Sequence, residues 1–188
     1  MAGGVTTDRK VLKTVEVMNL DTQAWSIAAD IPVPLYSASL VVNEDRFYMV
    51  GGSDKDGDPI QTVFRCSLIN LLPQVHGKQQ SKRGLKKVWK TRKIADIPVT
   101  DTTCVLVQGR LLTIGGISWN GRTTDAVYAY DPFKSRWITV SRMSLPRSEC
   151  FVAYLPEKNE VLVAGGYTEK SFAVCNLTDH VEVAIAIT

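Results

Sequence analysis

The stretch Leu111-Leu112-Thr113-Ile114-Gly115-Gly116 decides the fold of this chain, because its pattern recurs elsewhere in the sequence. The equivalent segments are Phe47-Tyr48-Met49-Val50-Gly51-Gly52 and Val161-Leu162-Val163-Ala164-Gly165-Gly166, and one more Gly-Gly pair stands at Gly3-Gly4. Four apolar or β-branched residues that end at glycine are typical of a short strand rather than a helix. The sequence therefore predicts a repeated, strand-rich unit.

Other residues keep a fixed distance from these glycine pairs. Trp25 lies 26 positions before Gly51, Trp89 lies 26 before Gly115, and Trp137 lies 28 before Gly165. A valine follows the second glycine by eleven residues three times, as Val15, Val63 and Val127. The pentapeptide at residues 29–33 also recurs letter for letter at residues 95–99. The unit thus consists of four strands: one after a proline, the Gly-Gly strand, a valine-led strand and a tryptophan strand.

The repeat gives explicit boundaries. First strands are predicted at 37–42, 102–107 and 149–154, and valine-led strands at 15–19, 63–68 and 127–131. The repeat units are predicted at roughly 1–36, 37–96, 97–142 and 143–188, with an insertion at 69–88 in the second of them.

A four-stranded unit of this length with Gly-Gly and a distant tryptophan resembles the kelch repeat of β-propellers. One unit carries the Tyr-Asp pair of that family as Tyr130-Asp131, and its Pro-Arg as Pro146-Arg147; other units depart from it, with Met18-Asn19 and Cys66-Ser67. The resemblance implies an all-β fold of kelch-type propeller blades, each a four-stranded antiparallel sheet. It further implies that the tryptophans pack between neighbouring blades.

The number of units predicts an incomplete propeller. The chain opens with third and fourth strands, contains two full repeats and ends inside a third strand. Closed propellers need 4–8 blades. We therefore expect part of a propeller: a fragment or truncated product, with assembly on another chain or an open array as alternatives. Apolar faces around residues 15–18 and 161–163 would then be exposed and would favour self-association.

Composition is that of a folded globular protein. The chain has 188 residues, 45% hydrophobic and 22% charged, and no apolar run approaches the ~18 residues of a membrane span. The N-terminus lacks a signal-peptide pattern, which predicts a cytoplasmic protein with reduced cysteines and no membrane partner. Cys104 and Cys150 are expected at equivalent positions of successive blades.

No catalytic, cofactor or metal residue is predicted. The segment Asp54–Asp58 begins like a calcium loop, but Pro59 and Arg65 stand where such a loop needs glycine and a carboxylate. We interpret it as a hairpin turn. Two histidines are too few for most metal sites, and nucleophile and phosphate-loop motifs are missing. The sequence therefore predicts a protein that is not an enzyme.

A basic segment is the strongest charge asymmetry. Residues 60–94 contain nine Lys and Arg and no Asp or Glu, which leaves the rest of the chain net negative. Its 78–93 loop offers an alternative function, binding of nucleic acid or an anionic surface, or nuclear import. A solvated loop is the simpler interpretation. Nucleic acid is the less favoured partner, because only Trp89 is interleaved for base stacking.

The kelch resemblance implies a non-catalytic scaffold that binds another protein, such as a substrate-recognition part of a ubiquitin ligase or a cytoskeletal binder. In such propellers the loops after Gly-Gly and before the first strands open onto one face. Trp, Tyr and Arg are enriched among binding hot spots. We therefore predict Tyr36, Trp119, Arg122 and Arg147 as contacts with an unidentified protein partner.

Overall fold

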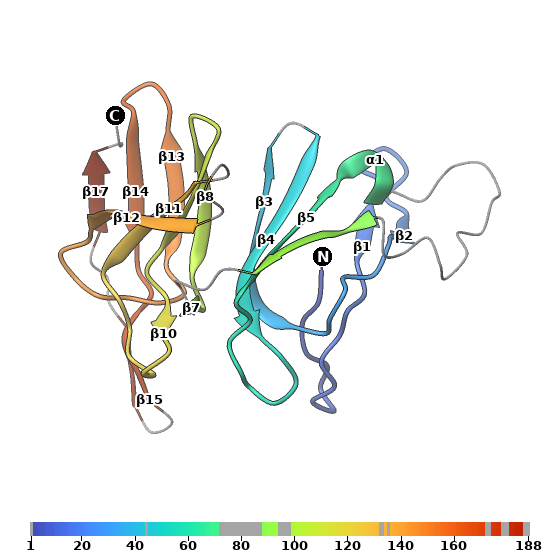
Figure 1. Ribbon diagram of the computed structural model, residues 1–188, viewed down its shortest axis with the longest axis horizontal. Coiled ribbons are helices and arrows are strands. Elements are labelled where there is room, and N and C mark those ends of the chain that lie inside the picture. The colour runs from blue at the N-terminus through green and yellow to red at the C-terminus, as the bar shows by residue number, and fades with distance from the viewer. Residues whose placement is uncertain are drawn as a thin grey trace.

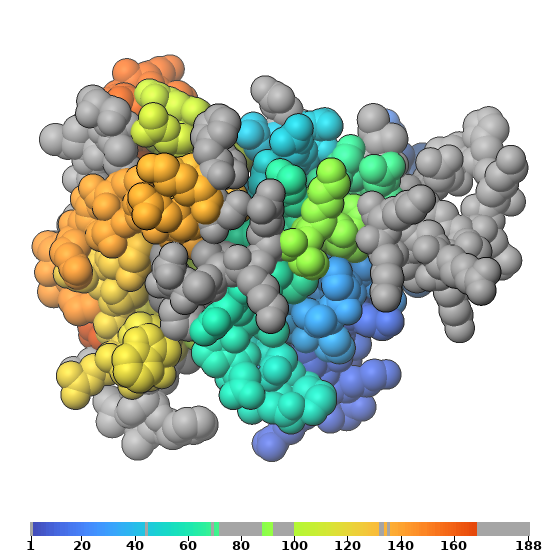
Figure 2. Space-filling view, in the orientation of Figure 1, coloured from blue at the N-terminus to red at the C-terminus, as the bar shows by residue number. Residues whose placement is uncertain are grey.

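The computed structural model describes residues 2–43, 45–71, 88–93, 99–131, 134, 136–171, 174–177 and 181–185. Strands dominate this part of the chain, together with one short helix, α1 (Leu68–Leu71). The strands form successive antiparallel sheets that stand side by side (Figure 1). Figure 2 shows the blue-to-green portion of the chain packed beside the yellow-to-red portion. The predicted all-β class is confirmed. No helix in the described residues is long and apolar enough to cross a membrane.

Two sheets have four strands each. The first contains β3 (Tyr36–Asn43), β4 (Arg46–Ser53), β5 (Thr62–Ser67) and β6 (Lys90–Lys93), and the second contains β8 (Thr103–Val107), β9 (Arg110–Ile114), β11 (Ala126–Asp131) and β12 (Arg136–Arg142). In both sheets each strand pairs antiparallel with the next strand of the same sheet. These are the four-stranded blades that the repeat predicts.

The flanking sheets are smaller within the described residues. An N-terminal pair consists of β1 (Glu16–Met18) and β2 (Trp25–Ile27), and a C-terminal sheet consists of β13 (Phe151–Leu155), β14 (Glu160–Ala164) and β17 (Val181–Ile185). Two short pairs accompany them: β7 (Val99–Thr100) with β10 (Ile117–Ser118), and β15 (Tyr167–Ser171) with β16 (Val174–Leu177). Within the described residues, two four-stranded blades therefore stand between two smaller sheets.

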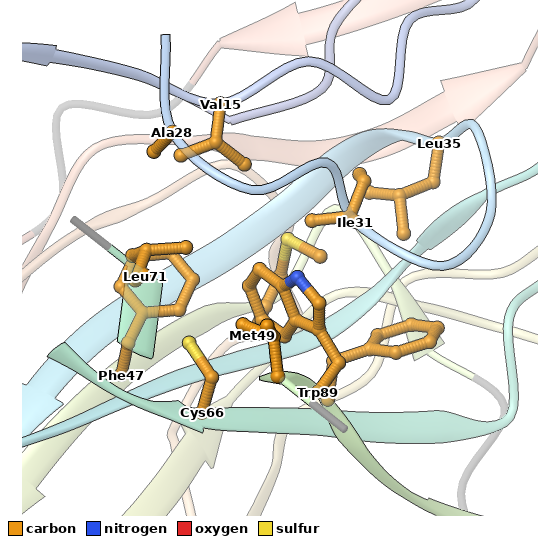
Figure 3. Close-up of a cluster of buried hydrophobic side chains, with 11 residues drawn as sticks. Val15, Ala28, Ile31, Leu35, Phe47, Met49, Cys66, Leu71 and Trp89 are labelled. Atoms are coloured by element: carbon orange, nitrogen blue, oxygen red, sulfur yellow. The ribbon is translucent and has the colours of Figure 1, made fainter. Parts of the chain in front are cut away.

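Buried hydrophobic clusters lie between neighbouring sheets. Trp89 is 5% exposed and packs among residues of the N-terminal segment, including Ile31, and of β4, including Met49 (Figure 3). Trp137 is equally buried in the cluster between the two four-stranded sheets. Packing of the tryptophans between blades is thus confirmed at these two positions. It is wrong for Trp25, which is 58% exposed because no further sheet of the described chain covers that face.

The Gly-Gly pairs form the joints between blades. Both Gly115 and Gly116 have positive φ, of 60° and 106°. A Cβ on Gly115 would lie 2.2 Å from the carbonyl oxygen of Arg147, at the entry to the next blade. A Cβ on Gly116 would lie 2.7 Å from the oxygen of Thr100, at the entry to its own blade. The same close approaches recur at Gly3 with Leu35, at Gly52 with Tyr36 and at Gly166 with Ser148. Only glycine fits, because backbone fills the space a side chain needs.

The expected exposed faces need a correction. Val15, Val161 and Val163 are 1–4% exposed, because each packs into a cluster with the neighbouring blade. Met18, at the end of the predicted 15–18 face, is exposed as expected, together with Leu20, Trp25 and Ile27 of the N-terminal pair. Self-association stays a prediction, and this N-terminal surface is where it would occur.

Cys104 and Cys150 are not equivalent. Thr103 pairs with Ile114, directly before Gly115, and Phe151 pairs with Ala164, directly before Gly165, so these two residues are equivalent. Cys104 comes one residue after Thr103, whereas Cys150 comes one residue before Phe151. The two cysteines therefore differ by two register positions. They also pack in different clusters, and both are free thiols.

Candidate functional site

The loops that follow the Gly-Gly pairs lie at one end of the sheets, along the lower edge in Figure 1. They are residues 5–11, 54–60 and 117–123 and the β15–β16 hairpin. The segments that enter the first strands meet them there, as the antiparallel bridges Ile117–Thr100 and Ser148–Tyr167 show. We call this end the loop face. The loops after the Gly-Gly pairs and the loops before the first strands thus meet at the same end of the sheets, as the kelch resemblance implies.

Trp119 projects from an ordered turn on the loop face. The backbone N–H of Ser118 donates to the Arg122 carbonyl at 2.9 Å, and that of Gly121 donates to the Ser118 carbonyl at 2.8 Å. The Asn120 side-chain oxygen accepts from the Ser118 hydroxyl at 2.6 Å and from the Arg122 N–H at 3.1 Å. These bonds fix the turn, yet Trp119 remains 78% exposed. Ser118 and Asn120 are not among the contacts predicted from the sequence, although Ser, Asn and Gly together are a turn signal.

The Trp119 turn is also attached to its neighbours. The Thr123 hydroxyl donates to the backbone oxygen of Thr168 in β15, which belongs to the next repeat. At the base of the turn, β10 pairs with β7. These contacts hold the backbone that carries Trp119, so less of the turn has to be ordered when a partner binds. Arg122 is exposed in the same turn, three positions after Trp119.

Tyr36 is half-buried at the start of β3. Its hydroxyl lies 3.9 Å from the point where a Cβ on Gly57 would stand, so its ring lies next to the loop of residues 54–60. Within that loop the Asp54 carboxylate accepts the backbone N–H groups of Asp56 and Asp58 at 2.9 and 3.0 Å. The predicted hairpin turn is confirmed. No group of three or more metal-ligating side chains occurs among the described residues.

The predicted partner contact at Arg147 needs a correction, because this residue is 0% exposed. Its carbonyl accepts the N–H of Gly116 at 2.8 Å, just as the carbonyl of Leu35 accepts that of Gly4 at 2.9 Å. Arg147 thus occupies the position that the buried Leu35 occupies at the entry to the first four-stranded sheet, two blades earlier. Its guanidinium Nη1 donates to the Gly165 carbonyl at 3.2 Å, so the side chain supports the next Gly-Gly turn from inside.

The predicted contacts therefore separate into an exposed pair, Trp119 and Arg122, a half-buried Tyr36 and a buried Arg147. Most of the basic 78–93 loop, and the insertion except for residues 69–71 and 88, lie outside the described residues. Trp89, the aromatic residue of that loop, is buried between sheets.

Burial controls the chemistry of the cysteines. It raises the pKa of the Cys66 and Cys104 thiols to about 12, and it also raises the pKa of Cys150. These thiols are therefore protonated at neutral pH, and a protonated thiol is a poor nucleophile.

We expect Cys66, Cys104 and Cys150 to resist iodoacetamide at pH 8 in the folded chain. In urea each thiol returns to an ordinary pKa and becomes accessible, so each should react readily. Mass spectrometry of peptides measures labelling at each site. Labelling of Cys104 at the same rate in buffer as in urea would contradict its position in the core.

The comparisons with known proteins agree with this architecture. Residues 98–144 match the family model described as the Kelch motif. The chain is 19% identical to alpha-scruin of Limulus polyphemus over 172 residues, and 18% identical to beta-scruin of the same organism over 155 residues. Those alignments cover 88% and 79% of this chain but 17% and 15% of the relatives.

Among solved structures, that of YjhT superposes with a TM-score of 0.69 at 16% identity. The match covers 95% of this chain and 51% of that one. The chain thus spans about half of the matched structure and under a fifth of the matched relatives.

Proposed function

We propose that the chain is a kelch-repeat protein of the β-propeller type and that it is a non-catalytic scaffold that binds another protein through its loop face. The observation that carries the proposal is the turn that holds Trp119 and Arg122 together in solvent. Kelch repeats and the similarity to the scruins support a protein-interaction role.

Ordering the groups of an interface costs free energy on binding. Immobilising a side chain with many rotamers costs roughly 0.5–1.5 kcal/mol on binding. Ordering a loop adds to this cost, and the hydrogen bonds of Ser118 and Asn120 already fix the backbone of the Trp119 turn, so less loop ordering remains. Tryptophan and arginine are also the residue types that most often dominate binding energy, because they combine large contact area with directed hydrogen bonds.

We expect Trp119→Ala to weaken capture of the partner at least tenfold, and Arg122→Ala to weaken it less. Trp25→Ala is the matched control, because Trp25 is an exposed tryptophan on the N-terminal strand pair, outside the loop face. Affinity chromatography with the wild-type chain would isolate the partner, and titration calorimetry would compare the variants. Equal affinity of wild type and Trp119→Ala would contradict the proposed surface. Loss of binding only in Trp25→Ala would place the interface on the N-terminal pair.

Two finer roles are open to such a scaffold: recognition of substrates for a ubiquitin ligase and binding to cytoskeletal filaments. Co-sedimentation with assembled filaments tests the second role, and co-purification with ligase subunits tests the first. In either case Trp119→Ala should reduce the signal and Trp25→Ala should not.

A second candidate function is suggested by the charge of the 78–93 loop, which would bind nucleic acid or another polyanion. Salt distinguishes it, because contacts to phosphates release counterions and weaken steeply as salt rises. Capture that persists from 50 to about 500 mM salt favours binding through the loop face. Salt screens the interactions of exposed charges, whereas it does not weaken the apolar contact that Trp119 would make.

A further inference from the structure

A cavity of about 250 Å³ opens at the end of the first four-stranded sheet. It lies where β4 begins and β5 ends, which is the end of these strands opposite the loop of residues 54–60. Its polar and charged lining comes from Asp45, Arg46, Arg65, Ser67, Asn70 and Lys90.

Two of the cations stand directly opposite each other, since Arg65 pairs with Lys90 across β5 and β6. Like charges in directly opposed positions destabilise a sheet. Arg65 pairs with Tyr48, which lies three residues before Gly51. In the next blade the residue three positions before Gly115 is Leu112, and it pairs with Ala129. Ala129 and its partner Ile138 therefore occupy the positions of Arg65 and Lys90. The equivalent position of the C-terminal sheet is Val183. The first blade therefore departs from an apolar pattern at the position where its cavity lies.

The cavity lacks a matching negative charge among the described residues. Asp45 is the one carboxylate in that lining, and it lies 3.7 Å from the Nε of Arg46, with both side chains more than half exposed. The Nε of Arg65 is inaccessible to solvent and has no hydrogen-bond partner in the described part of the chain. Cys66, also in the lining, adds no charge, because burial raises its pKa to about 12. Three cations and one carboxylate leave a net charge of +2.

We propose that this cavity binds the phosphate group of a small molecule. A phosphate dianion would balance the net charge, and guanidinium groups match the geometry of phosphate oxygens. Ser67 and Asn70 add neutral donors to the same lining. The site is separate from the loop face, so it goes beyond the proposed scaffold function.

Titration calorimetry on the full 188-residue chain tests this site, with inorganic phosphate and pyrophosphate as probes and chloride holding the ionic strength constant. We expect saturable binding of at least one probe. Arg65→Gln and Lys90→Gln should each weaken it at least tenfold. Arg110→Gln is the matched control, because Arg110 begins β9 as Arg46 begins β4, is exposed and does not line the cavity. This variant should bind like wild type, and so should Trp119→Ala.

Three outcomes would overturn the proposal: no saturable binding of either probe, equal loss in Arg110→Gln, or wild-type binding in both Arg65→Gln and Lys90→Gln. Lys90 is exposed, so its variant keeps the test decisive even if Arg65→Gln folds poorly. A variant with Lys82, Arg83, Lys86 and Lys87 changed to glutamine distinguishes phosphate binding in the cavity from phosphate binding by the insertion. Loss of binding there, with both cavity variants unaffected, would assign phosphate binding to the insertion instead.

Discussion

Gly115→Ala is expected to destabilise the chain by about 3 kcal/mol or more, enough to unfold a marginal domain. Two costs combine at this position. Its φ of 60° disfavours any L residue, and a Cβ would lie 2.2 Å from the Arg147 carbonyl oxygen. That oxygen also accepts the N–H of Gly116, so moving it away breaks a hydrogen bond between blades. Urea unfolding followed by far-ultraviolet circular dichroism measures the change.

Gly109→Ala provides the control for the backbone term alone. Gly109 has a φ of 76°, yet nothing lies within 4 Å of an added Cβ. We expect a loss of roughly 1–2 kcal/mol there, which is the cost of the left-handed conformation. If both variants lose the same stability, the close approach at the joint between blades contributes nothing.

The strands could be predicted from the sequence because their signal is local and repeated. The run Leu111 to Ile114, closed by Gly115, is readable without any tertiary information, and β9 has almost those bounds. The same holds for the predicted valine-led strands, since β5 and β11 begin one residue before Val63 and Val127. Because the same strand pattern occurs in several repeat units, a strand that is ambiguous in one unit can be predicted from its equivalents in the others.

Burial at particular positions could not be predicted in the same way, because it depends on neighbouring blades. Trp25 keeps the register of Trp89 and Trp137 but is exposed, since no described sheet covers it. Arg147 carries a charge typical of a surface loop and is nevertheless buried. Its correspondence to the buried Leu35 is the signal for this burial. Each of the two residues directly precedes the one, Tyr36 or Ser148, whose carbonyl oxygen lies against the second glycine of its own blade.

The exposed position of Trp119 could be predicted from the sequence, whereas the cavity could not. Trp119 lies within a short segment that could be interpreted as a loop, so its exposure followed from local reasoning. The cavity depends on the pairing of Arg65 with Lys90, which lie 25 residues apart on either side of the insertion. Pairing across such a segment is fixed by the sheet, and the sequence does not specify it.

Trp137→Ala is expected to cost about 3–5 kcal/mol, because it removes the largest side chain between the two four-stranded sheets. Trp137 is 5% exposed and packs with Val50 and Val63 of the first sheet, and its ring lies 5.2 Å from that of Tyr130. Its indole Nε1 has no hydrogen-bond partner in the described residues, so the loss measures packing and the remaining cavity. Trp119→Ala is the matched control, with an expected change within about 0.5 kcal/mol at its exposed position. Both values come from denaturant midpoints under identical conditions. Similar losses at the two positions would mean that the contact between the blades does not depend on the tryptophan strand.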